Sequence, residues 1–244
     1  MRSLIRSCLA LASTTLLLLA NSLAQEAPPA GEVPAELRLA ALPAPLAVEN
    51  HPVSVRALGE RSFELVAPAR TNLFNSPDGK FVRQDAAMLL FSPDRDFVLT
   101  ARVSAELRSV YDVAALVVYQ DANTWAKFCY ENSVERQPTL VSVVTRGSSD
   151  DCNSIAAPAD GVFLAIVRKG DEFAFHASTD GRVWRLIRHF SLPLAAGARL
   201  GFAAHGSGAT TLRAVFSEIS YRPVLTSNVR RPEIAAPPPT DIKP

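Results

Sequence analysis

The chain has 244 residues, of which 48% are hydrophobic and 20% charged, and its formal net charge is +1 at pH 7. A composition this close to neutral lacks the basic excess with which proteins bind nucleic acid or an anionic membrane surface, so we expect no nucleic-acid partner. The span of roughly 170 residues between His51 and Arg222 is long enough for one domain with a sizeable hydrophobic core.

Residues 1–24 have the pattern of a secretory signal peptide. Two arginines precede an apolar run that ends at Ala20, and Ser22-Leu23-Ala24 places small residues where a cut before Gln25 requires them. The run is shorter than the ~20 residues of a membrane-spanning helix, and an uncleaved anchor is the competing interpretation. Cleavage would remove both arginines and leave 23 basic against 24 acidic residues. We expect an exported protein, periplasmic or secreted, with no stable membrane insertion after cleavage.

Two stretches rich in alanine and proline flank the central part of the chain. Residues 25–50 include Ala27-Pro28-Pro29-Ala30, and residues 223–244 include Ala236-Pro237-Pro238-Pro239. Proline has no backbone N–H to donate, so such segments do not sustain the hydrogen bonds of a sheet. We expect a linker at 25–50, one domain at 51–222 and a disordered tail at 223–244.

Between these flanks the hydrophobic residues recur with a period of two. In the segment 97–104 every second residue is hydrophobic, which is the pattern of a strand buried on one face. By the same criterion we expect strands at 53–57, 63–67, 87–91, 113–120, 124–131, 139–145, 161–168, 171–177, 183–191, 200–205 and 212–217. Turn sequences such as Thr179-Asp180-Gly181 separate these segments. Many short strands joined by tight turns predict an all-β fold, a two-sheet antiparallel jelly-roll sandwich.

Two of the three cysteines, Cys129 and Cys152, follow the signal segment. An oxidising compartment would permit one disulfide between them. Cys129 is expected on a strand and Cys152 in a loop beyond the next strand, so that loop must fold back to bring the two Cα atoms within about 7 Å. The sequence leaves the bonded and the free state open.

Several segments of the domain carry a resemblance to a known family. They are residues 96–103, 112–154, 163–192 and 215–221, and Phe63-Glu64-Leu65 with Asn72-Leu73-Phe74. These segments resemble the regulation-of-enolase proteins, which are assigned to the concanavalin A-like lectin/glucanase superfamily. The resemblance implies a concanavalin A-like sandwich, in agreement with the strand pattern. The family name describes a regulatory effect of a cytoplasmic relative, and because this chain has an export signal we do not expect that role here.

The sequence offers little of the chemistry that an enzyme of this fold requires. A retaining glycan hydrolase needs two carboxylates about 5 Å apart on one face, whereas paired acids such as Asp150-Asp151 fall in expected turns. The chain has no Gly-x-Ser-x-Gly motif, and His176 and His189, on adjacent expected strands, lack a third zinc ligand at a suitable spacing. We expect no catalytic residues.

The hairpin at 124–146 carries the most distinctive side chains. A turn centred near residues 135 and 136 would place Cys129 opposite Ser142, with Lys127 and Glu131 on the same face. Aromatic rings can stack on a sugar ring, while charged groups bind its hydroxyls. The candidate ligand-binding residues are Tyr119, Trp125, Lys127, Glu131, Arg168 and His176. The alternative is an ordinary solvated sheet face on which Lys127 pairs with Glu131.

The segment 145–154 is rich in the oxygen ligands that calcium prefers, although its spacing is not that of an EF-hand. The alternative is a turn whose Asp and Ser side chains bind nearby backbone amides. Calcium is thus the one cofactor that the sequence leaves open; none is otherwise expected.

The segment 178–184 is similar to the Asp-box hairpins of sialidase propellers, one residue short of their usual spacing. Asp180-Gly181 suits a type I′ turn, after which Trp184 packs back across the hairpin. We expect this element to stabilise the fold rather than to bind a ligand.

These observations favour an exported, non-catalytic recognition domain with carbohydrate as its possible ligand, an inference that rests mainly on the fold. Two alternatives remain. One is a glycan hydrolase of the same fold with an unrecognised carboxylate arrangement that includes Glu131. The other is a structural or protein-interaction module without a small ligand.

Overall fold

The structure is a computed structural model that describes residues 33–223 and 226–235. These residues form strands joined by turns and loops, with no helix among them. A helix long and apolar enough to cross a membrane is accordingly missing from this part of the chain. The predicted signal peptide, residues 1–24, lies outside the described residues.

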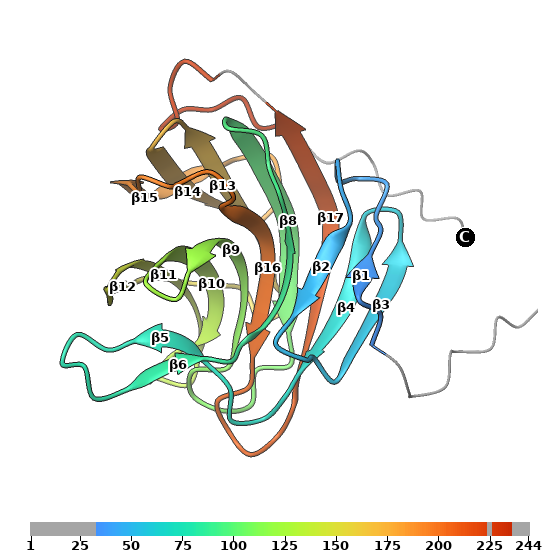
Figure 1. The fold of residues 1–244 in the computed structure, drawn as a ribbon, viewed down its shortest axis with the longest axis vertical. Coiled ribbons are helices and arrows are strands. Elements are labelled where there is room, and N and C mark those ends of the chain that lie inside the picture. The colour runs from blue at the N-terminus through green and yellow to red at the C-terminus, as the bar shows by residue number, and fades with distance from the viewer. Residues whose placement is uncertain (1–32, 224–225, 236–244) are drawn as a thin grey trace, which may run out of the picture. The chain divides into compact units, whose positions relative to one another are not determined.

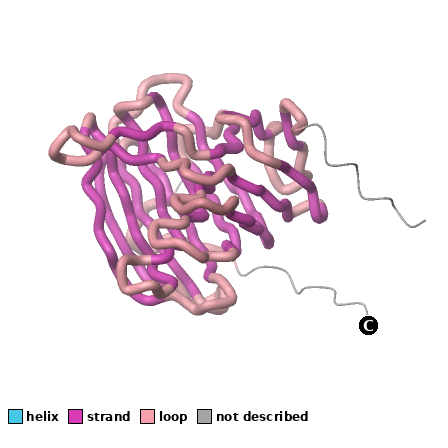
Figure 2. The backbone as a smooth tube through the Cα atoms, turned by 90° about the horizontal axis from the view of Figure 1, so that it is seen from below, coloured by secondary structure: helices cyan, strands magenta, loops and turns pink. Residues whose placement is uncertain are grey.

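Two antiparallel sheets make up the domain (Figure 1). The eight-stranded sheet has the order β1 (Glu36–Leu37), β2 (Leu46–Glu49), β7 (Ala87–Phe91), β16 (Arg199–His205), β9 (Val113–Asp121), β10 (Thr124–Asn132), β11 (Pro138–Arg146), β12 (Ser148–Ala156). The seven-stranded sheet has the order β15 (Arg185–Ser191), β14 (Glu172–Ser178), β13 (Val162–Lys169), β8 (Phe97–Ala105), β17 (Leu212–Pro223), β4 (Ser62–Ala67), β3 (Ser54–Gly59). β5 (Leu73–Asn75) and β6 (Val82–Gln84) form a separate hairpin. Figure 2 shows the strands side by side, with loops gathered at their ends. The predicted two-sheet antiparallel sandwich is confirmed.

The main hydrophobic core lies between the two sheets, because alternate residues of each strand point inward. Phe128 of β10 points into this core and stacks on Phe175 of β14, with ring centroids 5.0 Å apart. Lys127 and Cys129, the two neighbours of Phe128 on β10, point to the opposite face of the sheet. There, on the outer face of the eight-stranded sheet, Trp125 and Cys129 belong to a second apolar cluster.

The register of the β10–β11 hairpin differs by one residue from the prediction. Cys129 lies opposite Val141, not opposite Ser142. A slip of one residue exchanges the two faces of a strand, so Val141 and Val143 join Cys129 on the outer face and Ser142 leaves it. The surroundings of Lys127 on β10 are therefore more apolar than predicted.

Arg188 of β15 ties the edge strand β12 to the other sheet. Its guanidinium group donates to the Ser142 Oγ atom and to the Asp150 carbonyl oxygen, each at 3.2 Å, and lies 3.1 Å from the Asp150 carboxylate. β12 and β15 are the edges of their sheets. These contacts close the sandwich on that side and hold β12 in place.

Parts of both flanking segments belong to the domain, which corrects the predicted linker at 25–50 and the tail at 223–244. β1 and β2 lie within the first, where Leu37 and Leu46 are buried in the main core. In the second, Val229 is fully buried against Val98 and Ala174 on the seven-stranded sheet. The amino-acid composition of these segments does not predict these contacts, because a few well-spaced apolar residues are enough to anchor a proline-rich segment.

The 178–184 segment has the features of a structural element. The Asp180 carboxylate accepts hydrogen bonds from the backbone N–H of Val183 and of the residue before it, which lower the pKa of Asp180 to about 2. Gly181 has φ 70°, whereas Asp180 is not among the described residues with positive φ, so the predicted type I′ turn is wrong. Trp184 packs against Phe163 of β13, with ring centroids 6.5 Å apart.

Candidate functional site

The β5–β6 hairpin lies against the outer face of the eight-stranded sheet. Leu73 of β5 is fully buried in the outer apolar cluster with Trp125 and Val141. The side-chain amide of Asn75 donates to carbonyl oxygens of the β9–β10 and β11–β12 turns, at 2.9 Å each. Apolar packing at one end and hydrogen bonds at the other thus fix the hairpin over the sheet.

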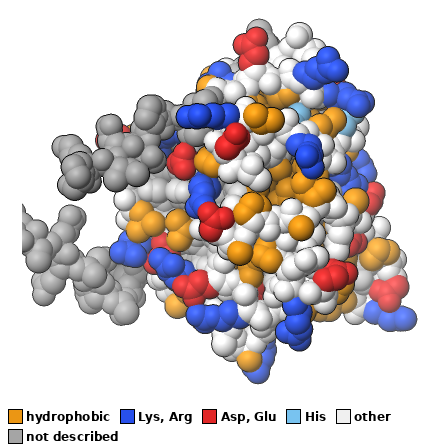
Figure 3. Space-filling model, turned by 180° about the vertical axis from the view of Figure 1, so that it is seen from behind, with side chains coloured by type: hydrophobic (Ala, Val, Ile, Leu, Met, Phe, Trp, Pro, Cys, Tyr) orange, Lys and Arg blue, Asp and Glu red, His pale blue; other side chains and the backbone are white. Residues whose placement is uncertain are grey.

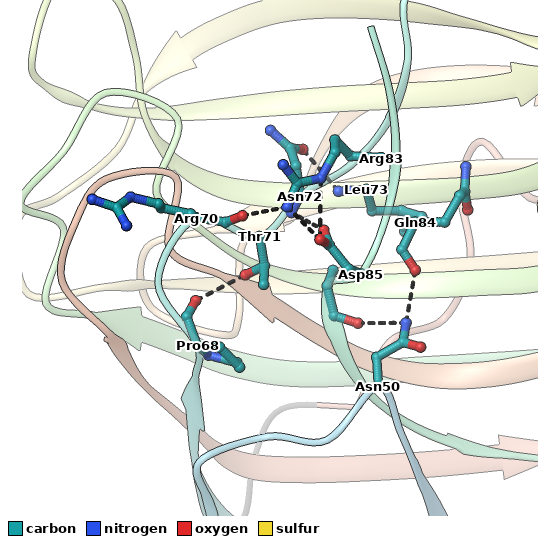
Figure 4. Close-up of polar contacts among 10 residues, drawn as sticks. Asn50, Pro68, Arg70, Thr71, Asn72, Leu73, Arg83, Gln84 and Asp85 are labelled. Atoms are coloured by element: carbon teal, nitrogen blue, oxygen red, sulfur yellow. Dashed lines mark hydrogen bonds and ion pairs between the residues drawn. The ribbon is translucent and has the colours of Figure 1, made fainter.

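A hydrogen-bond network holds the chain where it enters and leaves the hairpin (Figure 4). The Asn72 N–H donates to the Asp85 carboxylate at 2.8 Å, and the Asn50 amide donates to two carbonyl oxygens of segment 84–86 at 2.9 Å each. Arg83 donates to the same Asp85 carboxylate and to a carbonyl oxygen of the loop before β5. The hairpin is therefore a fixed wall above the sheet.

A cavity of about 500 Å³ lies between this wall and the sheet. Its charged and titratable lining residues are Arg70, Arg83, Lys127, Glu131, Asp151 and His205, and its aromatic lining residues are Phe74, Phe81 and Tyr111. The volume falls in the range of small-molecule sites, roughly 300–1,000 Å³. On the face of the molecule shown in Figure 3, basic and acidic side chains are interspersed with apolar ones.

The strand register arranges the floor of the cavity in two rows. Lys127 lies opposite Val143, which in turn lies opposite Asp151 of β12. Glu131 lies opposite Val113, which in turn lies opposite His205 of β16. Four residues of an antiparallel strand separate the rows, which corresponds to about 13 Å between their Cα atoms. Each row thus contains one buried group of β10 and, two strands away, a polar group of another strand.

Two opposite charges are buried in this floor without direct partners. Lys127 is 3% exposed and Glu131 is 7% exposed. Within the described part of the chain, neither forms a hydrogen bond or an ion pair, and Lys127 has only a cation–π contact, 5.8 Å from the Trp125 ring centroid. Neither the Lys127 Nζ atom nor the Glu131 carboxyl oxygens are among the fully buried side-chain atoms without hydrogen-bond partners, and both residues line the cavity, so both groups are open to a ligand.

Burial also sets the protonation of the groups around Lys127. It raises the pKa of Glu131 to about 7, an effect that the Lys127 charge opposes and the Asp151 charge reinforces. Burial, together with the Lys127 charge, lowers the pKa of His205 well below its usual range. Burial raises the pKa of Cys129 to about 12. Near neutral pH the pocket thus holds a neutral imidazole and a carboxyl group that both donates and accepts.

Tyr111 lines the pocket with a strained backbone. Its φ angle is 67°, in the left-handed region that non-glycine residues seldom adopt. Its N–H donates to the Asn132 carbonyl oxygen at 2.7 Å, and its own carbonyl oxygen accepts a hydrogen bond from the Ser207 hydroxyl. Such strain persists only where neighbours impose it, and it concentrates at functional sites.

Of the six predicted ligand residues, the structure brings only Lys127 and Glu131 into the pocket. Trp125 is completely buried beneath the cavity, so it supports the floor and offers no exposed stacking surface. Tyr119 shares the outer face, but it lies near Arg199 and does not line the cavity.

The other two candidates belong to the seven-stranded sheet. Arg168 of β13 donates to the Gly170 carbonyl oxygen at 2.7 Å, and the His176 ring lies 2.8 Å from the Val229 carbonyl oxygen. Both residues lie away from Lys127, because β13 and β14 belong to the seven-stranded sheet and β10 to the eight-stranded one.

Sequence reasoning missed most of the pocket. The sequence predicts a turn at Asp151, yet this residue lies on β12, and His205 ends β16, two strands away from Glu131. Arg70 and Tyr111 come from loops. The alternation of the 200–205 segment places His205 on a definite face, but which strands neighbour it depends on the topology.

The two cysteines of the described chain are free thiols, and their positions exclude the disulfide. Cys129 points to the outer face, whereas Cys152 lies opposite Ser142 on β12, is exposed and points the other way. The strand β11 lies between the strands of Cys129 and Cys152. Their Cα atoms are therefore roughly 9–10 Å apart, beyond the reach of a disulfide.

The predicted calcium loop at 145–154 is mostly strand β12. Successive side chains of a strand point to opposite faces, so the acidic residues of this segment do not converge on one point. No group of three or more His, Cys, Asp or Glu suited to a metal ion occurs in the residues described.

The fold defines the chain as a jelly-roll β-sandwich protein. It belongs to the family described as "protein of unknown function (DUF1349)", whose model matches residues 49–224. No protein with a curated description matches the chain.

Solved structures share the fold at low sequence identity. A functionally unknown protein from Saccharomyces cerevisiae is 23% identical with a TM-score of 0.67, and the match covers 74% of this chain and 97% of that one. The GH43 BlXynB protein from Bacillus licheniformis is 15% identical with a TM-score of 0.54 over 69% of this chain and 38% of that one. A xylan beta-1,4-xylosidase from Bacillus halodurans is 13% identical with a TM-score of 0.54 over 72% of this chain and 38% of that one. The present chain thus spans well under half of either Bacillus protein.

Proposed function

We propose that this protein is an exported, non-catalytic recognition domain that binds carbohydrate in the pocket under the β5–β6 hairpin. The observation that carries the proposal is the pair of buried charges, Lys127 and Glu131, without direct partners at the floor of a 500 Å³ cavity. Sugar hydroxyls both donate and accept hydrogen bonds, so one sugar ring can satisfy an ammonium group and a carboxyl group together.

The walls of the pocket suit the same ligand. Phe74, Phe81 and Tyr111 supply aromatic surface for the apolar face of a sugar ring. A cavity of about 500 Å³ matches one or two sugar units rather than a long chain laid along a groove. Two similar structures bear names from glycan chemistry, a GH43 protein and a xylan xylosidase, and this supports the class of ligand through the fold alone.

A glycan array with the purified protein tests the proposal, with Glu131→Gln as the site variant and Glu135→Gln, exposed in the β10–β11 turn, as the matched control. We expect specific binding that Glu131→Gln weakens by about tenfold or more, since it removes a hydrogen-bonding carboxylate. The control is expected to bind like the unmodified protein. A blank array, or equal binding by both variants, would count against the proposal.

Glycan hydrolysis is the second candidate, because Glu131, with a pKa of about 7, shares the pocket with the Asp151 carboxylate. A raised pKa suits a general acid, and a second carboxylate suits its partner. Chromatography of the array ligands after incubation separates the two functions. Intact ligands support recognition, whereas shortened products that disappear with Glu131→Gln support hydrolysis.

Export is proposed from residues 1–24 of the sequence, whose apolar run and small residues fit a signal peptide. Expression of the full chain in a bacterial host, followed by mass spectrometry of the intact protein, is expected to find an N-terminus at Gln25 in the periplasm or medium. Full-length protein retained with the cells would contradict export. The regulatory role implied by the regulation-of-enolase name is not proposed for this chain.

A further inference from the structure

We infer that the ligand is an acidic sugar, a hexuronic acid bound with its carboxylate against the Lys127 ammonium group. This inference rests on the proposed function and names the chemical class of its ligand.

The charges of the pocket favour an anion at its floor. Lys127 is its most deeply buried cation, and the Asp151 side chain, the nearest fixed anion in its row, belongs to an exposed residue at the edge strand. Arg70 adds a second cation at the mouth, and Arg83 is neutralised by Asp85. Lys127 and Arg70 thus remain as two cations of the pocket, against the carboxylates of Asp151 and Glu131.

Glu131 offsets the Lys127 charge only in part. The two side chains form no ion pair, and they start from rows about 13 Å apart at their Cα atoms. Since burial raises the pKa of Glu131 to about 7, the carboxyl group is about half protonated near neutral pH. An anion next to Lys127 therefore meets a positive charge that Asp151 and a partly ionised Glu131 offset without pairing with it.

A neutral sugar would leave the Lys127 charge uncompensated, whereas a uronate places a carboxylate against it. Hydrogen bonds between ionised groups are roughly twice as strong as neutral ones. We therefore expect a preference for the acid of about tenfold or more over an uncharged sugar of the same shape.

The rest of the pocket is arranged for the remainder of such a sugar. With the carboxylate at the Lys127 row, the ring hydroxyls reach toward the row of Glu131 and His205, where a carboxyl group and a neutral imidazole offer hydrogen-bonding atoms. Tyr111, held in its strained backbone conformation, and Phe81 flank this space with aromatic rings. The geometry thus separates a site for the charge from a site for the hydroxyls.

Calorimetry with D-glucuronate, D-galacturonate and D-mannuronate, their methyl esters and their neutral parent sugars tests the inference. The ester keeps the shape of each acid and removes its charge. We expect at least one acid to bind about tenfold more tightly than its ester. Lys127→Met is expected to abolish this difference, and Lys169→Met, on the other sheet, is expected to preserve it.

Each other result has a definite meaning. Equal affinity for an acid and its ester, or a preference for the acid that survives Lys127→Met, would overturn the inference and leave the carbohydrate proposal intact. Binding of neutral sugars alone would do the same. Failure of every sugar here would overturn the inference, and a blank glycan array in addition would overturn the proposed function as well.

Discussion

Replacing Lys127 with methionine is expected to raise the free energy of unfolding of the ligand-free protein by about 1–3 kcal/mol at pH 6. Lys127 as a whole is 3% exposed, and its ammonium group has no ion-pair partner within the described chain. Methionine fills a similar volume without a charge to desolvate, and the surrounding Val143 and Cys129 are apolar. Urea denaturation of the variant and the unmodified protein measures the difference. A variant less stable than the unmodified protein would show that Lys127 serves the fold.

The increase in the free energy of unfolding caused by Lys127→Met is expected to become smaller as the pH rises from 6 to 8. Removing the lysine charge raises the pKa of Glu131 further above its unfolded value, because Lys127 is the group that lowers it. A carboxyl group whose pKa is raised in the folded state destabilises that state once the pH exceeds the unfolded pKa. Cys129, whose pKa is raised to about 12, and His205, whose pKa is lowered well below its usual range, keep their charge between pH 6 and 8. Lys169→Met, which is exposed, should change stability by less than about 0.5 kcal/mol at either pH.

Replacing Gly201 with alanine is expected to destabilise the protein by about 4 kcal/mol or more, a large part of the roughly 5–15 kcal/mol that stabilises a typical domain. A Cβ atom at this position would lie 2.0 Å from the carbonyl oxygen of Leu89 and 3.1 Å from the Cα atom of Leu90. Both are backbone atoms of β7, which is paired with β16 inside the sheet and cannot move away without breaking its hydrogen bonds. Thermal and urea unfolding of the soluble variant measure the loss.

Gly59→Ala is the matched control for this prediction. Its Cβ atom would meet only the Ser62 hydroxyl oxygen, at 3.2 Å, at an exposed position at the end of an edge strand. We expect a change within about 1 kcal/mol. Similar stability of the Gly201 and Gly59 variants would mean that β7 and β16 can separate locally.

The period of two was sufficient to predict the fold, because each of the twelve expected strands corresponds to an observed one. The period of two did not predict the short strands β1, β2, β5 and β6, since two to four residues carry too little alternation. The strand β12 was not predicted for another reason. Its sequence is polar, and it forms a strand because β11 offers a free edge and Arg188 holds it from the other sheet.

The site was predictable only where a single strand defines it. Lys127 and Glu131 are four residues apart on β10, so alternation alone places them on one face. The face of β11 was assigned wrongly because the turn position, and hence the register, was off by one residue. His205 and Asp151 reach the pocket through strand order, and Arg70 and Phe74 reach it through the path of the β5–β6 hairpin. Neither the strand order nor the path of the hairpin follows from the local sequence pattern.

The attachment of the β5–β6 hairpin has an evolutionary consequence. In the described chain β5 pairs only with β6, so the hairpin contributes no strand to either sheet. Insertions, deletions or substitutions in its tip, residues 76–81, can therefore reshape one wall of the cavity while the sandwich keeps its pairing and its core. Relatives can diversify in what they bind at little risk to folding, and a library of hairpin tips on this scaffold offers the same freedom to the protein engineer.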